Sequence, residues 1–193
     1  MLITVSGPAG SGKSTLAANL AAALGYDHVS GGDIFRDLAA ERGMSLVEFN
    51  RAAEDDESVD LDLDRRLRST ARERDDLVLE SRLAGWMAGD HADLRVWLDG
   101  PLEVRAARIA DREDKHVERA AEETRARAES EAGRYRDYYG IDIDDLGIYD
   151  LVVNTARWDA ESVLALVRAA AERYDAGSDE GKLPVGGVDY TFE

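Results

Sequence analysis

The stretch LITVSGPAGSGKSTLAANL, residues 2–20, decides the fold of this chain. Residues 2–5 form an apolar, β-branched run, and residues 16–20 are rich in alanine and leucine. Between them, residues 7–15 match the pattern G-x-x-x-x-G-K-[ST], the phosphate-binding P-loop. A strand, a glycine-rich loop and a helix in this order are the context that supports the motif. The alternative is a structural glycine-rich turn that binds nothing.

The P-loop predicts a site for a polyphosphate. Its glycines let backbone N–H groups approach the phosphates, and the helix N-terminus adds a partial positive charge. Lys13 is predicted to contact the β- and γ-phosphate oxygens, and the Ser14 hydroxyl to hold Mg²⁺. The predicted residues of this nucleotide-phosphate site are Gly7, Pro8, Ala9, Gly10, Ser11, Gly12, Lys13, Ser14 and Thr15.

Length and composition limit the class of protein. With 193 residues and 44% hydrophobic residues, we expect one globular domain with a substantial core. The chain has no cysteine, which excludes disulfides and thiolate metal sites. No signal peptide is recognisable, and no run approaches the ~20 apolar residues of a membrane span. We therefore expect a cytoplasmic protein that does not bind membranes.

The charge is strongly acidic, with a formal net charge of −17 at pH 7. Of the 24 basic residues only Lys13, Lys115 and Lys182 are lysines. A carboxylate-rich surface with few lysines favours a protein that works in concentrated salt, with the codon bias of a GC-rich genome as the alternative. So acidic a surface argues against a nucleic-acid polymer as partner.

The apolar pattern predicts an α/β fold of the P-loop NTPase type: a five-stranded parallel sheet with helices on both faces. The expected strands are 2–5, 26–29, 77–80, 95–99 and 151–154. The expected helices are 13–24, 34–39, one capped by Ser45, 61–74, 81–88, 102–111, 117–139 and 161–174. Residues 54–60 are expected to form a solvated acidic turn, and residues 176–193 a loose tail. Polar residues at the carboxyl ends of the strands predict a site at that edge.

Two further segments at this edge carry candidate ligands. Ser30-Gly31-Gly32-Asp33-Ile34-Phe35-Arg36 follows the second strand, and its glycines allow a second ligand to approach closely. Glu80-Ser81-Arg82 follows the third strand, and Glu80 could bind Mg²⁺ through water. The alternatives are a solvated Arg36 and a surface ion pair between Glu80 and Arg82.

Arginines are frequent in the last third of the chain, among them Arg105, Arg108, Arg112, Arg125 and Arg127. Acidic residues are interleaved with them, which favours salt-bridged surface for most. A lid that closes over transferring phosphates needs two or three arginines. The spacing does not decide which of them act.

These motifs together resemble the nucleoside monophosphate kinases and, within them, the archaeal-type cytidylate kinases, over residues 1–173. Residues 30–36 look like the family's monophosphate-binding turn, and residues 80–87 like the segment in which a glycine usually stands where this chain has Ser81. Residues 108–113 and 125–127 resemble the two ends of the lid. The stretches 135–142 and 149–155 distinguish this branch from adenylate kinases, and the loop after Asn154 flanks the adenine by similarity.

The resemblance implies a kinase domain over 1–175, with an NMP-binding segment at about 31–75 and a lid at about 112–136. It implies γ-phosphoryl transfer from ATP to CMP or dCMP by a monomer that needs Mg²⁺. The alternatives are adenylate kinase, dephospho-coenzyme A kinase and a non-enzymatic ATP-dependent switch. The candidate residues are Lys13, Arg82, Arg108, Arg112 and Arg127 for catalysis; Gly31, Asp33, Arg36 and Arg82 for the acceptor; and Ser14 and Glu80 for the metal.

Overall fold

A computed structural model describes residues 1–45, 48–49, 52 and 56–185. Its centre is a five-stranded sheet in the order β2-β3-β1-β4-β5, and every neighbouring pair is parallel. The strands are β1 (Leu2–Ser6), β2 (Asp27–Ser30), β3 (Leu77–Glu80), β4 (Leu94–Asp99) and β5 (Leu151–Asn154). The predicted five-stranded parallel sheet is confirmed.

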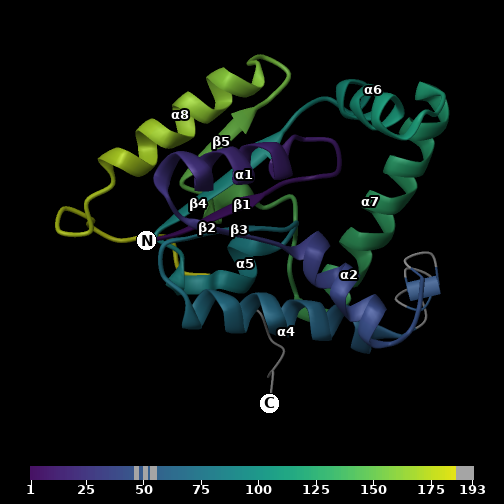
Figure 1. The fold of residues 1–193 in the computed structure, drawn as a ribbon, viewed down its shortest axis with the longest axis horizontal. Coiled ribbons are helices and arrows are strands. Elements are labelled where there is room, and N and C mark those ends of the chain that lie inside the picture. The colour runs from purple at the N-terminus through teal and green to yellow at the C-terminus, as the bar shows by residue number, and fades with distance from the viewer. Residues whose placement is uncertain (46–47, 50–51, 53–55, 186–193) are drawn as a thin grey trace.

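Helices cover both faces of this sheet (Figure 1). They are α1 (Lys13–Leu24), α2 (Gly31–Glu41), α4 (Glu57–Glu73), α5 (Ala84–Ala88), α6 (Leu102–Glu113), α7 (Val117–Tyr139) and α8 (Ala160–Arg173). Two short 3₁₀ helices, η1 (Gly89–His91) and η2 (Leu146–Ile148), precede β4 and β5. α6 and α7 project together beyond the sheet edge, on the same side as α2 (Figure 1).

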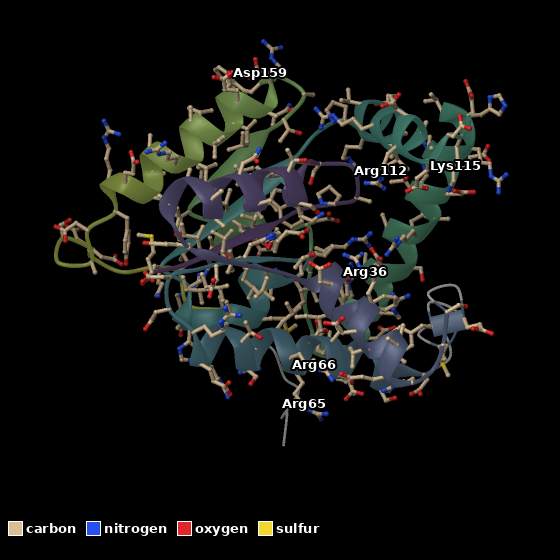
Figure 2. The ribbon with its side chains drawn as sticks, in the orientation of Figure 1. Arg36, Arg65, Arg66, Arg112, Lys115 and Asp159 are labelled. Carbon is tan, nitrogen blue, oxygen red and sulfur yellow. The ribbon has the colours of Figure 1, made fainter. Side chains whose placement is uncertain are left out.

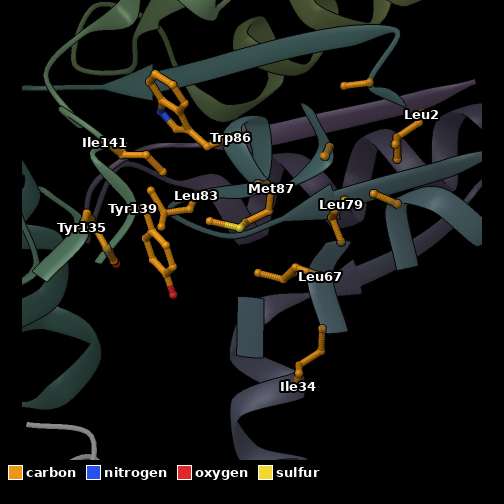
Figure 3. Close-up of a cluster of buried hydrophobic side chains, with 14 of the residues drawn as sticks. Leu2, Ile34, Leu67, Leu79, Leu83, Trp86, Met87, Tyr135, Tyr139 and Ile141 are labelled. Atoms are coloured by element: carbon orange, nitrogen blue, oxygen red, sulfur yellow. The ribbon is translucent and has the colours of Figure 1, made fainter. Parts of the chain in front are cut away.

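Alternating strand residues place a separate core on each face of the sheet. On one face, Ile3 and Val5 of β1 pack in a cluster with Leu16 and Leu20 of α1 and residues of α8. On the other face, Leu77 and Leu79 of β3 pack in a cluster with residues of α2, α4, α5 and α7 (Figure 3). A parallel strand buried on both faces is mostly apolar, which explains the nearly continuous apolar runs in the sequence.

Some boundaries differ from the prediction. Residues 57–60 of the predicted acidic turn 54–60 belong to α4, whose N-cap Asp56 accepts a hydrogen bond from the Ser58 N–H at 3.0 Å; residues 54 and 55 lie outside the described residues. Val59 is fully buried, and the burial of its side chain favours a helix in this acidic segment. The helix expected from Ser81 begins at Ala84. Ser45 bonds with Glu48 as predicted for a cap, while Leu46 and Val47 of that helix lie outside the described residues.

The described end of the chain docks on the body of the protein. Lys182 donates to the carbonyls of Asp90 and Ala92 at 2.6 and 2.7 Å, and Val185 packs against the core. The Leu183 carbonyl accepts at 2.7 Å from Arg95, an arginine of β4 with no exposed side-chain surface. Residues 182–185 of the predicted loose tail thus contact the body of the protein, while residues 186–193 lie outside the described residues, so the tail as a whole stays a prediction. Within the part of the chain that the structure describes, no helix combines the length and apolarity needed to cross a membrane.

Candidate active site

The P-loop joins β1 to α1 and lies tightly against β4 and α6. Gly7 has φ 143°, and a Cβ at this position would lie 2.1 Å from the Leu98 carbonyl oxygen. Only glycine fits such a conformation with a neighbouring strand so close. This close packing holds the backbone N–H groups of the loop around a candidate anion position at the N-terminus of α1.

Lys13 lies half-buried at the start of α1, and its Nζ donates to the Pro8 carbonyl at 3.0 Å. Burial lowers the pKa of Lys13 to about 7; the carboxylate of Glu80 opposes this shift, and Arg82, Arg127 and Arg105 reinforce it. A cation that is desolvated beside other cations favours an anionic ligand. The site is therefore built for phosphate groups.

Two arginines of α6 support the loop. Arg105 donates to the Gly100 carbonyl at 2.8 Å and to the Ala9 carbonyl at 3.0 Å. Arg108 donates to the hydroxyl and carbonyl of Thr155 at 2.9 and 2.8 Å. Arg108, a predicted catalytic residue, thus ties the segment after β5 to α6, beside the P-loop. Sequence reasoning assigned no role to Arg105, because helical spacing alone did not distinguish it from surface arginines.

A cavity of about 310 Å³ opens on this side of the P-loop. Its walls include Thr15 of the P-loop, Arg108, and the half-exposed indole of Trp158. An exposed aromatic ring next to a phosphate-binding loop is suited to stacking on a flat heterocycle. The sequence predicted that the loop after Asn154 flanks the adenine of ATP, and that role stays a prediction.

A second cavity, of about 700 Å³, lies between the P-loop, α2, α4, the end of β3 and α7. Among its lining residues are the predicted Lys13, Gly31, Arg36, Glu80, Arg82 and Arg127, together with Gly32, Phe35, Leu63, Asp64, Leu67, Ser81, Leu83, Glu123, Ala126, Ser130, Glu131, Arg134 and Tyr135. The structure therefore brings together predicted residues from four segments far apart in sequence. Figure 2 shows Arg36 on α2, on the side of that helix that faces α7.

Three cations of this cavity, Arg36, Arg82 and Arg127, are paired with carboxylates. Glu131 of α7, 9% exposed at its side chain, contacts both Arg82 and Arg127, with 2.9 Å to the Arg127 Nε. Burial lowers the pKa of Arg82 to about 10, and the guanidinium remains charged at neutral pH. Arg36 pairs with Asp33, and both side chains are more than half exposed. Sequence reasoning missed Glu131, because nothing in the local pattern separates it from the other acidic residues of α7.

Close packing of backbone shapes the floor of the cavity. A Cβ at Gly31 would lie 2.7 Å from the Cβ of Ser81. Ser30 caps α2 by accepting from the Gly32 N–H at 3.1 Å, and its hydroxyl donates to Glu80 at 2.8 Å. The ends of β2 and β3 are thereby joined, and the Glu80 carboxylate is held 5% exposed beside Lys13.

The donor set at this point fits a magnesium ion that is held mainly by phosphates. The Ser14 side chain is exposed at the N-terminus of α1, and Glu80 offers a fixed carboxylate near Lys13. Mg²⁺ takes oxygen ligands and usually keeps several waters, with one or two protein groups and substrate phosphates completing its shell.

Arg112 does not line either cavity. Its side chain is 68% exposed and pairs with Glu113 near the turn between α6 and α7. Figure 2 shows Arg112 and Lys115 at that end of the molecule. A catalytic role for Arg112 would require movement of α6 and α7, so it stays a prediction.

Sequence comparison gives full-length relatives. The model of the family described as "Cytidylate kinase-like family" matches residues 2–157. Proteins named cytidylate kinase from Haloarcula marismortui and Pyrococcus horikoshii are 66% and 48% identical to the chain. The alignments cover 100% of both chains in the first case, and 94% of this chain and 93% of the relative in the second. The relative from Haloarcula marismortui comes from a halophile, in agreement with the acidic composition.

Structure comparison shows the fold alone. A shikimate kinase from Bacteroides thetaiotaomicron superposes with a TM-score of 0.61 at 17% identity, covering 89% of this chain and 98% of that one. A gluconokinase from Sinorhizobium meliloti gives a TM-score of 0.59 at 16% identity, covering 89% and 91%. The sheet and its flanking helices are thus those of small P-loop kinases.

Proposed function

The chain belongs to the cytidylate kinase-like family, and from that premise we propose that it transfers the γ-phosphoryl group of ATP to CMP or dCMP, giving ADP and CDP or dCDP. The observation that carries this proposal is the meeting of Lys13 with Arg36, Arg82 and Arg127 in one cavity of about 700 Å³. This cavity adjoins the P-loop, so a bound monophosphate would point its phosphate at the γ-phosphate of ATP.

The reaction needs little covalent chemistry from the protein. The attacking atom is an oxygen of the CMP phosphate, which is already anionic, so no general base is required. Catalysis consists of holding two nucleotides in line and of neutralising charge on the transferring group. Lys13 contacts the donor phosphates, Arg36 holds the acceptor phosphate, and Arg82 and Arg127 reach both from the side of β3 and α7.

The Ser14 hydroxyl and, through water, the Glu80 carboxylate would hold Mg²⁺. When bound, the ion supplies positive charge to the phosphate oxygens of ATP. Ser30 serves this arrangement by fixing the Glu80 carboxylate with its hydroxyl.

Water has to be kept from the γ-phosphate, because it would compete with CMP and convert the enzyme to an ATPase. The segments at about 31–75 and 112–136 supply the walls of the acceptor cavity, and we propose that they close when both substrates are bound. Arg112 would enter the site in that closed state.

An ADP-release assay tests the proposal with CMP, dCMP, UMP, AMP and dephospho-coenzyme A as acceptors. We expect the highest kcat/KM with CMP or dCMP, and loss of transfer in Lys13→Ala but not in the surface control Arg168→Ala, whose side chain pairs with Glu172 on α8 away from both cavities. Preference for AMP or dephospho-coenzyme A would identify another small-acceptor kinase. ATP binding without turnover on any acceptor would favour a nucleotide-dependent switch.

A further inference from the structure

Helix α4 contributes an unusual wall to the acceptor cavity. Among the α4 side chains that the structure describes, those lining the cavity are Leu63, Asp64 and Leu67, so this part of the wall is apolar apart from one carboxylate and carries no cation. The cations of the cavity come instead from α1, α2, the end of β3 and α7. The wall formed by α4 is therefore suited to the uncharged part of a nucleotide, not to its phosphate.

The carboxylate in that wall is buried. Asp64 is 4% exposed, and among the α4 side chains that the structure describes it is the one ionisable group that is buried. Desolvating a carboxylate costs free energy that hydrogen bonds have to offset. An acid kept at such a position within a ligand cavity is a candidate for ligand recognition.

Tyr139 of α7 fixes the orientation of this carboxylate. Its hydroxyl donates to Asp64, and the tyrosine itself has no exposed surface. Tyr135 and Tyr139 lie close to Leu83 at the edge of the core cluster (Figure 3). A carboxylate has two oxygens with about four acceptor positions, so the bond from Tyr139 is compatible with a further donor from a ligand.

We propose that Asp64 accepts a hydrogen bond from the 4-amino group of cytosine and so selects CMP over UMP; this inference rests on the proposed function. Cytosine offers an N–H donor at position 4, to which Asp or Glu accepts, whereas the corresponding atom of uracil is an acceptor oxygen. A buried carboxylate therefore attracts the first base and repels the second. Leu63 and Leu67 supply the apolar surface on which the ring rests.

The test is the ratio of kcat/KM for CMP to kcat/KM for UMP in Asp64→Asn. The substitution keeps the shape and one acceptor oxygen, and adds an N–H₂ group that can donate to uracil. Because a hydrogen bond to a charged group is strong, we expect the ratio to fall by at least about tenfold, with the KM for ATP unchanged. Tyr139→Phe frees the carboxylate to reorient and should lower the ratio by a smaller factor.

Asp62→Asn is the matched control. Asp62 lies on the same helix, pairs with Arg42 and Arg65, and does not line the cavity. This variant should keep the ratio of the unmodified protein. A ratio in Asp64→Asn within twofold of that of the unmodified protein would overturn the inference. A change confined to the ratio of CMP to dCMP would also overturn it, because it would place Asp64 against the ribose.

A modified acceptor tests the same contact in the unmodified protein, whether or not the variant folds. The 5′-monophosphate of 2-pyrimidinone riboside lacks the 4-amino group, so it should be phosphorylated at least about tenfold less efficiently than CMP. Equal efficiency would refute the role of Asp64. Absence of turnover with CMP itself would instead contradict the proposed function, so the two failures are distinguishable.

Discussion

Binding of ATP should drive proton uptake by Lys13. In the free protein, burial lowers the pKa of this lysine to about 7, and Arg82, Arg127 and Arg105 act in the same direction. The triphosphate places several negative charges against the ammonium group, which raises its pKa towards or above the usual value. Lys13 therefore gains a proton as ATP binds at any pH between these two pKa values.

The size of the uptake follows from the pKa. With a pKa of about 7, Lys13 is roughly one-tenth protonated at about pH 8 in the free protein and fully protonated in the complex. We expect uptake of about 0.9 proton per ATP at that pH, falling to about 0.1 at about pH 6. Because the complex binds more protons, ATP affinity should decrease as pH rises above 7, by nearly tenfold per pH unit.

Isothermal titration calorimetry with MgATP and no acceptor measures the uptake, at one pH in buffers of different ionisation enthalpy. Lys13→Met should abolish the buffer-dependent heat, whereas the control Lys115→Met should retain it, since Lys115 pairs with Glu113 and Glu123 on the surface. Uptake below about 0.3 proton at about pH 8 would refute the reasoning, because Lys13 would then hold its proton before ATP arrives.

Four further outcomes are expected. Arg36→Ala should raise the KM for CMP by at least about tenfold and leave that for ATP unchanged, because Arg36 serves the acceptor phosphate; an equal loss of ATP affinity would contradict this division. Ser30→Ala removes the α2 cap and the bond to Glu80, so urea unfolding should show a loss of about 1–2 kcal/mol, and an unchanged midpoint would count against it. Arg95→Met should cost about 1–3 kcal/mol in the same assay, because the carbonyls of Ile148, Leu183 and Gly89 lose their donor; no loss would show that water replaces the guanidinium. With a net charge of −17, the melting temperature should rise from about 0.1 M to about 2 M KCl, and indifference to salt would leave codon bias as the explanation of the composition.

The fold was predictable because its signals are local. The strand, loop and helix of residues 2–20 follow one another in sequence, and every strand except β2 is marked by its own apolar run. The bounds of β3, β5 and α7 agree with the prediction for the same reason. Residues 57–60 were misassigned because their composition is acidic, whereas their place in α4 depends on the burial of Val59 by distant parts of the chain.

The site was predictable in part. The P-loop and the segments after β2 and β3 were recognisable, because parallel strands deliver their carboxyl ends to one edge. The arginines of α6 and α7 that line the cavities could not be predicted, because their positions depend on how these two helices lie over the sheet. Arg82 and Glu131 are 49 positions apart, and Asp64 and Tyr139 are 75 apart. No spacing rule links residues so distant in sequence.

The separate cores on the two faces of the sheet imply a modular enzyme. The cavity proposed for the acceptor borders one core through Leu67 and Leu83, while the cavity proposed for ATP borders the other through Leu16 and Leu98. Substitutions in the core below one of these cavities therefore do not alter the core below the other cavity. Such a scaffold can exchange the compound it phosphorylates, through substitutions on a single face, without rebuilding the machinery that handles ATP.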